Sequence, residues 1–417
     1  MFSRYSLRAL IFLYFLLAGV TWVSGSAGQG ILGRVALADV LGLLIVFFAL
    51  LVVFKTRKGM VIVPTPFRLY MPFFLVLVLS VVFSDYPEKG LIEVLVHLYI
   101  FIVSLSLFVI FVQSKNLLSF EDILGLILGS GAVLSAIGLV QFLFLPNLFQ
   151  GAFGGLSGTF RNTGQAGAFF ALYIGIIVPG FLAGLIRPSL RNFILLLVIV
   201  LALILTFKRA AWIGLLIGFV LLVLRMSFSR SARDKKFAAY GLILIFVLAP
   251  VVLGVFSWAI ENVNGMAWRF QSKISQDAGE DFIEGFFMEN VHAMWLALVD
   301  NPIFGAGAAN VAGVYTTKYE IHSTYMKIVA TTGLVGTAFY LVFMSGFSVS
   351  MLKVGSLRNK YSEYLRYVFP FFVGMVVSWA YTYHLRKREF WIFFAVVCFC
   401  LYLSRRVSRN EINLGRL

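Results

Sequence analysis

The chain has 417 residues, of which 61% are hydrophobic and only 12% are charged, and its mean hydropathy is +0.95. Soluble globular proteins have about 25% charged residues, so this chain has too few polar residues to cover a water-facing surface. Its high apolar content also excludes a disordered chain. Because the apolar runs are continuous rather than alternating, they predict an all-α, polytopic membrane protein rather than a membrane β-barrel.

The apolar runs predict about twelve membrane-spanning helices, since one span needs about 20 mostly apolar residues. We interpret the first run as an uncleaved helix rather than a signal peptide, because many spans follow it. Residues 1–417 are therefore predicted to form a single membrane domain. In chain order the predicted helices cover residues 7–24, 35–54, 68–84, 91–113, 122–145, 165–186, 190–206, 209–225, 237–260, 323–352, 364–384 and 388–404.

The net charge of +16 is typical of a membrane protein with basic cytoplasmic loops. With the N-terminus inside, 22 of the 34 Lys and Arg residues fall in inner segments, which predicts that both termini are cytoplasmic. The two cysteines, Cys398 and Cys400, lie within an apolar run and are predicted to be free thiols.

Residues 261–322 form the one long hydrophilic connection between predicted helices, and the charge distribution places it outside. The loop contains eight of the 18 acidic residues. Its apolar residues recur at near-helical spacing, so part of it is either a helix lying flat on the membrane or a lid packed on the bundle. These apolar residues are Ile283, Phe286, Phe287, Met294, Trp295 and Leu298.

Two outer segments have the residue types of an anion site. The segment 158–165 combines glycines with Arg161, and glycines let backbone N–H groups approach an anion. The second segment places Lys208 and Arg209 directly before a predicted helix, whose N-terminus also favours an anion. Adjacent cations near hydrocarbon are costly unless an anion or acid pairs with them, although snorkelling at the membrane interface is the alternative.

A third candidate lies at the end of the long loop, where the turn 301–307 precedes His322 at the start of the tenth predicted helix. An imidazole can accept a proton near neutral pH, so His322 is a candidate general base, with a structural role as the alternative. Lys327 lies one turn beyond Ser323 on the same helix face and is a candidate substrate-binding residue, with pairing to a buried carbonyl or acid as the alternative.

The fourth candidate is the short outer loop 384–388, where Arg386 and Arg388 could hold a pyrophosphate or an anionic lipid headgroup. Contact with headgroups without specificity is an equal alternative. Glu93 and His97, four residues apart on one predicted helix, are expected to form a structural hydrogen bond.

These fragments resemble the O-antigen ligase/polymerase superfamily. The resemblance rests on the segments 208–212, 301–307 and 322–336, on their order around one long outer loop, and on the earlier segment 158–160. It implies a metal-independent membrane glycosyltransferase of the class C type, with no cofactor and no metal site. In this class His322 and Arg209 would be catalytic, and the residues expected to bind substrate are Arg161, Lys208, Arg269, Lys327, Arg386 and Arg388.

The sequence departs from the family pattern at several positions. Lys208 stands where a serine is usual, and Ser323 replaces the Asn that usually follows the histidine. Val291 occupies the position of an Arg four residues before Trp295, so Arg269, Lys273 or His292 would have to supply that charge. A Glu that often precedes the helix glycine is Thr331 here.

The resemblance implies transfer of a glycan from undecaprenyl pyrophosphate to a lipid A-core acceptor on the periplasmic side of the bacterial inner membrane. The alternatives are a polymerase that extends another lipid-linked glycan, a transporter of lipid-linked glycans, and a structural assembly protein. A transporter would not need His322, and a structural protein would need neither His322 nor Arg209. Membrane lipids are expected partners, and nucleic acid is not.

Overall fold

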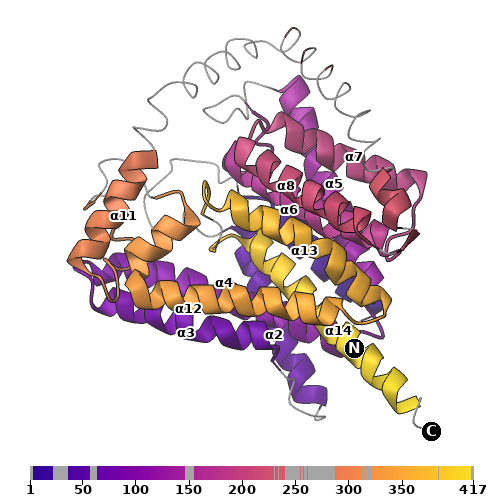
Figure 1. Cartoon of the computed structure of the whole chain (residues 1–417), viewed down its shortest axis with the longest axis horizontal. Helices are drawn as coiled ribbons and strands as arrows, with labels where there is room; N and C mark the ends of the chain where they lie inside the picture. Colours follow the sequence, from indigo (N-terminus) through magenta and orange to yellow (C-terminus); the bar gives the residue numbers. More distant parts are fainter. Residues whose placement is uncertain are drawn as a thin grey trace.

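The protein is all-helical over the part of the chain that the computed structural model describes (Figure 1). The described residues are 3–21, 36–56, 63–145, 155–229, 287–311, 321–383 and 385–414, together with 231–232, 234–239, 254, 257, 261 and 314–315. Within them the helices are α1 (Arg4–Ala18), α2 (Leu37–Thr56), α3 (Thr65–Val82), α4 (Pro87–Gln113), α5 (Phe120–Phe144), α6 (Thr163–Leu182), α7 (Leu190–Leu205), α8 (Arg209–Ser227), α11 (Met288–Asp300), α12 (Thr324–Gly355), α13 (Lys360–Ser378) and α14 (Arg388–Leu414).

Eight of the described helices are long and apolar enough to cross a membrane, which confirms a polytopic membrane helical bundle. They are α2, α3, α4, α5, α6, α8, α12 and α14. Helices α1, α7 and α13 also lie where apolar spans were predicted, but α1 has only 15 residues and α7 only 16. The predicted ninth span, 237–260, lies almost entirely outside the described residues.

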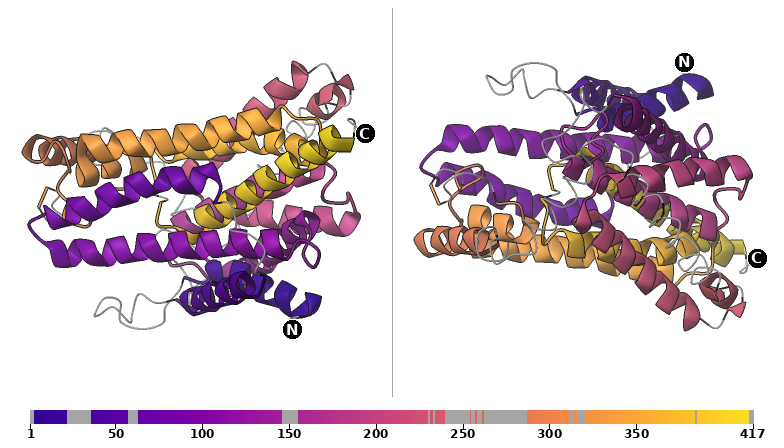
Figure 2. Two further views of the ribbon diagram at one scale, coloured as in Figure 1. Left: turned by 90° about the horizontal axis from the view of Figure 1, so that it is seen from below. Right: turned by 90° about the horizontal axis from the view of Figure 1, so that it is seen from above.

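The helices form two groups with α13 and α14 between them (Figure 1). In one group α3 packs against α12 and α4, and α4 also packs against α2; in the other, α5 packs against α6 and α7. Helix α13 packs against α6, α8, α12 and α14, so it joins the groups. Both chain ends lie toward the same end of the bundle, and α11 lies at the opposite end (Figures 1 and 2).

Small residues bring α8 and α13 into close contact. A methyl group added at Gly214 would lie 2.9 Å from the carbonyl oxygen of Gly374, and one added at Gly218 would lie 2.8 Å from the ring of Phe371. Such close approach is how helices associate where lipid removes the hydrophobic drive. Since α8 and α13 run antiparallel, the start of α8 lies beside the end of α13.

Helix α12 is broken at Gly333, which has φ 61° and ψ −161°. The break frees backbone groups, and the turn 302–307 supplies their partners. Ala306 and Gly307 donate N–H groups to the carbonyls of Ala330 and Thr331, at 2.9 and 3.2 Å. In return, the N–H groups of Leu334 and Val335 donate to the carbonyls of Pro302 and Ile303. The first segment of α12, residues 324–332, is therefore a separate short helix held by this turn.

The close approach of the turn 302–307 to the break in α12 explains why each of these two segments contains a glycine. A Cβ atom on Gly305 would lie 2.5 Å from the carbonyl carbon of Thr331, and one on Gly333 would lie 2.5 Å from the carbonyl oxygen of Ile303. Both residues also have a positive φ angle, which residues other than glycine rarely adopt. Gly305 of the turn and Gly333 of α12 therefore each lie against the backbone of the other's segment.

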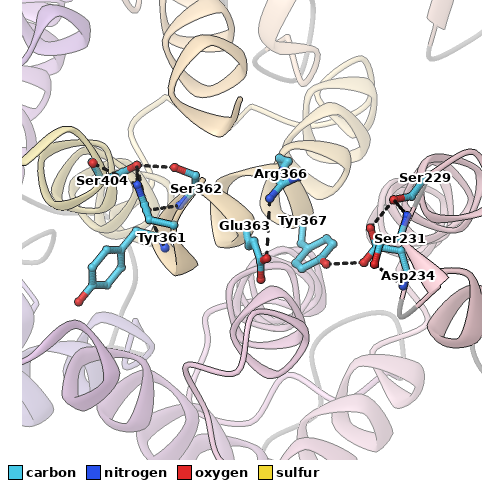
Figure 3. Close-up of polar contacts among 10 residues, drawn as sticks. Ser229, Ser231, Asp234, Tyr361, Ser362, Glu363, Arg366, Tyr367 and Ser404 are labelled. Carbon is cyan, nitrogen blue, oxygen red and sulfur yellow. Dashed lines mark hydrogen bonds and ion pairs between the residues drawn. The ribbon is translucent and has the colours of Figure 1, made fainter. Parts of the chain in front are cut away.

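At the end of the bundle that carries the chain ends, polar contacts join α13 to its neighbours (Figure 3). The hydroxyl groups of Ser362 and Ser404 lie 2.5 Å apart, which links α13 to α14. Tyr367 donates a hydrogen bond to Asp234 at 2.9 Å. Cys398 and Cys400 are free and buried, as predicted.

The predicted orientation leads to a labelling experiment. Val314 is 49% exposed and lies in the loop expected outside, whereas Ser231 is exposed in a segment expected inside. In intact cells Val314→Cys should therefore react with a membrane-impermeant maleimide, and Ser231→Cys should react only after the membrane is permeabilised. The buried native cysteines keep the background low. The reverse pattern would place the Lys208 end of α8 in the cytoplasm.

Candidate active site

The two predicted anion-binding segments lie side by side in the fold. The N–H of Leu156 donates to the carbonyl of Leu205 at 2.7 Å, and a methyl group on Gly155 would lie 2.4 Å from the carbonyl oxygen of Thr206. Phe207 has φ 53°, a strained value for an aromatic residue. The contacts of Gly155 and Leu156 stabilise this strained turn, and the turn fixes the position of Lys208, the next residue.

Lys208 lies against the start of α6. A methyl group built on Gly164 would lie 3.8 Å from Lys208 Nζ, and one on Gly167 would lie 2.9 Å from Lys208 Cβ. Lys208 is also the N-cap residue of α8, where no side chain caps the helix. The ammonium group of Lys208 therefore lies where the N-termini of two helices meet, and each N-terminus carries a partial positive charge.

Further cations flank this point. Arg209 is exposed at the first position of α8, and Arg161 is exposed one residue before Asn162, the N-cap of α6. Both helices are described along their whole length, and neither has an acidic residue in its first turn. The backbone of Arg161 is fixed, since its N–H donates to Thr21 Oγ1 at 2.9 Å. The site concentrates positive potential and suits a phosphate or pyrophosphate.

A pocket of about 690 Å³, its open mouth included, extends from Lys208 between α6, α8 and α13. Along α6 it runs from Gly164 to Gly175, a distance of about 16 Å at 1.5 Å per residue. Its walls are mostly small or apolar, which suits an acyl or prenyl chain better than a sugar. The lining residues include Gly164, Ala168, Ala171, Gly175, Lys208, Ala211, Gly214, Phe371, Met375, Ser378 and Thr382.

His322 is exposed at the start of α12, directly before the helix N-cap Ser323. The start of α12 is hydrogen-bonded to the segment that follows α13, which forms part of the pocket wall. Thr324 donates its N–H to the carbonyl of Trp379 at 2.9 Å and its hydroxyl to the carbonyl of Thr382 at 2.5 Å. Thr382 itself lines the pocket, so the helix that carries His322 and the pocket that contains Lys208 share one structural element.

The cations of the 384–388 loop are held by acids from other helices. Arg388 forms a bidentate ion pair with Asp39 of α2, with N–O distances of 2.6 to 3.0 Å. Arg386 donates to Glu93 Oε2 at 2.8 Å and remains 41% exposed. Burial lowers the pKa of the neighbouring Lys387. These contacts tie the start of α14 to α2 and α4, and a role for Arg386 and Arg388 in binding substrate remains a prediction.

The predicted hydrogen bond between Glu93 and His97 is not formed: His97 Nε2 and Glu93 Oε1 are 3.8 Å apart, too far for a hydrogen bond. Instead, the ring nitrogens of His97 contact the hydroxyl groups of Tyr70 at 3.2 Å and Tyr383 at 2.9 Å. Lys327 is buried, with its ammonium group 4.2 Å from the centre of the Tyr383 ring. The partner of His97 could not be predicted, since Tyr383 is 286 residues away along the chain.

Of the long loop, the structure describes mainly α11. Its small residues Ala293 and Ala297 are fully buried against Ala306 and Ala330, whereas Trp295 is 59% exposed. This part of the loop is packed on the bundle, as the lid interpretation predicted. Arg269 and Lys273 lie outside the described residues. Among the described residues, no three His, Cys, Asp or Glu side chains gather closely enough to hold a metal ion.

The comparison with protein families bears directly on this arrangement. Residues 193–341 match the family described as O-antigen ligase. The match confirms the predicted resemblance to the O-antigen ligase/polymerase superfamily. It includes Lys208, Arg209, α11, the turn 302–307 and His322, whereas Arg161 and Glu93 lie before it. A comparison with curated proteins found no match.

The O-antigen ligase match covers less than half of the chain, but it contains the starts of α8 and α12. Lys208 at the start of α8 lines the pocket, and Thr324 at the start of α12 binds Thr382, which also lines it. Sequence reasoning missed the pocket itself. Its signal was a small-residue face on α6, formed by Gly164, Ala168, Ala171 and Gly175.

Proposed function

We propose that the protein is a glycosyltransferase that moves a glycan from a lipid-linked pyrophosphate donor to a lipid-linked acceptor at the outer face of the bacterial inner membrane. The observation that carries this proposal is the meeting of two helix N-termini at Lys208, which lines an apolar pocket, with Arg209 as the next residue along the chain. An undecaprenyl pyrophosphate donor has a matching charged head and apolar tail.

Breaking the glycosidic bond to a pyrophosphate builds negative charge on the leaving group. Arg209, Lys208 and the N–H groups at the starts of α6 and α8 would stabilise that charge. Arg161 would add charge near the start of α6. Since the site is preformed, its dipoles need little reorganisation during the reaction.

His322 would act on the acceptor hydroxyl, either by accepting its proton or by orienting it. The acceptor oxygen would then form the new bond to the sugar as the pyrophosphate leaves. Lipid A-core is the proposed acceptor of a ligase, and a second lipid-linked glycan is that of a polymerase. Neither reaction assigns a step to a metal or cofactor.

Filling the pocket tests the assignment of the lipid tail. Ala171 lines the pocket, so Ala171→Trp should weaken the binding of lipid-linked pyrophosphate about 10-fold or more. Binding can be measured with a fluorescent polyprenyl pyrophosphate in detergent. The matched control is Leu216→Trp on α8, whose side chain is 56% exposed. Equal binding by the two variants would place the lipid tail elsewhere.

A further inference from the structure

A cluster of polar side chains, three of them buried, lies beside the segment that carries His322, and the proposed chemistry gives it no role. We name it the Glu93 cluster; it consists of Glu93 and His97 of α4, Lys327 of α12, and Tyr383 and Arg386 of the α13–α14 connection. Glu93, His97 and Lys327 are 7%, 1% and 6% exposed. Charged groups buried within a membrane bundle are costly, and such groups commonly serve a function.

The contacts within the Glu93 cluster form a chain from α4 to α12. Glu93 binds Arg386 at 2.8 Å, and His97 binds the Tyr383 hydroxyl at 2.9 Å, so α4 holds the α13–α14 connection at two points. The ammonium group of Lys327 then lies 4.2 Å from the centre of the Tyr383 ring. Apolar residues would pack here without the cost of burying charge, so stability alone does not explain the cluster.

The segment 324–332 depends on these contacts because it is separated from the rest of α12 at Gly333. On one side the turn 302–307 holds its end. On the other side Thr324 binds the α13–α14 connection, and Tyr325 donates to the carbonyl of Val376 at 2.5 Å. The position of His322 is therefore set by the α13–α14 connection, and α4 sets the position of that connection.

We propose that Glu93 and Tyr383 are positioning residues: by holding the α13–α14 connection on α4, they fix the segment 324–332 and so place His322 against the acceptor. Neither residue touches the reacting atoms. This inference rests on the proposed function for its kinetic consequence, but its structural consequence, the placement of His322, is independent of the reaction.

The kinetic test is Glu93→Gln, which removes the charge that holds Arg386 and keeps the size of the side chain. We expect kcat to fall by about 100-fold, as misplacement of a reacting group by about 1 Å can cause. The KM for the donor should not change, since the donor is assigned to Lys208 and Arg209. Glu93→Asp keeps the charge and should recover part of kcat. Tyr383→Phe, which loses only its hydroxyl group, should lower kcat less than Glu93→Gln.

The matched control is Glu121→Gln, which makes the same substitution in another ion pair. Glu121 binds Lys360 at 2.5 Å and links α5 to α13 at the opposite end of the bundle. The kcat and KM of the Glu121→Gln variant should equal those of the wild type, although the thermal stability of the variant falls. A similar loss of kcat in both variants would show that Glu93 is only structural and would overturn the proposal.

A second readout does not depend on activity. Diethyl pyrocarbonate modifies exposed imidazoles, and mass spectrometry of the peptide that contains His322 gives its rate. The rate should differ from the wild-type value in Glu93→Gln and Tyr383→Phe, because the surroundings of His322 change, and stay at the wild-type value in Glu121→Gln. If Glu93→Gln does not fold, Tyr383→Phe decides the matter by both readouts.

The two proposals can fail separately. Full activity of Arg209→Ala and His322→Ala would remove the proposed function, while the modification rate would still report where His322 lies. If those two variants are inactive but Glu93→Gln and Tyr383→Phe keep the wild-type kcat and modification rate, the positioning role is wrong and the proposed function stands.

Discussion

Arg209→Ala is expected to lower the rate of glycan transfer by about 100–1,000-fold, because it removes a cation that we propose stabilises the departing pyrophosphate. Arg209 is exposed at the first position of α8, so the variant should insert and fold normally. The rate should be measured under single-turnover conditions in proteoliposomes with a saturating lipid-linked donor, so that weaker binding does not mask the chemical step.

Two further variants sharpen this result. Arg209→Lys should recover only part of the rate, since an ammonium group cannot form the bidentate hydrogen bonds to a phosphate that a guanidinium forms. Arg191→Ala removes an exposed arginine from the first turn of α7, at the other end of that helix from Lys208, and should transfer at the wild-type rate. Wild-type activity of Arg209→Ala would remove Arg209 from the site and leave Lys208 and Arg161 as the candidates.

His322→Ala is expected to lower transfer by about 100–10,000-fold, the usual contribution of a general base, while donor binding stays at the wild-type level. Binding should be unaffected because the donor is assigned to the cations at the starts of α6 and α8. Transfer to the acceptor and binding of fluorescent donor are measured on the same preparation.

His322→Gln separates the two possible roles of the ring. Glutamine can donate and accept hydrogen bonds but cannot take up a proton at neutral pH. If His322→Gln retains most of the activity, His322 orients the acceptor rather than deprotonating it. Full activity of His322→Ala would make the residue structural and would favour the transporter alternative.

Hydropathy was sufficient to predict the membrane bundle, because a span must be about 20 apolar residues long wherever it packs. The predicted divisions between 190–206 and 209–225 and between 364–384 and 388–404 agree with the structure, since α7 and α8 are separate helices and so are α13 and α14. Helix α1 is shorter than predicted because it ends at Gly19, where the chain turns to contact Thr159.

The break in α12 could not be predicted, because Gly333 is tolerated in a continuous helix until another backbone segment takes its freed hydrogen bonds. The candidate residues Lys208, Arg209 and His322 were found from residue type and position alone. Their relation to one pocket depends on α13, which packs between the helices and which no local pattern assigns to that place. Glu93 was seen in the sequence, but its partner Arg386 is 293 residues away.

The most direct test of the account is transfer by the purified protein in proteoliposomes, with a pyrophosphate-linked glycan in the bilayer and lipid A-core or a second lipid-linked glycan as the acceptor. The account predicts that the glycan becomes bonded to the acceptor, that free lipid pyrophosphate is released, and that both products are lost in Arg209→Ala and His322→Ala. Whichever acceptor is extended distinguishes a ligase from a polymerase. Movement of the intact donor across the bilayer without a new glycosidic bond would contradict the account.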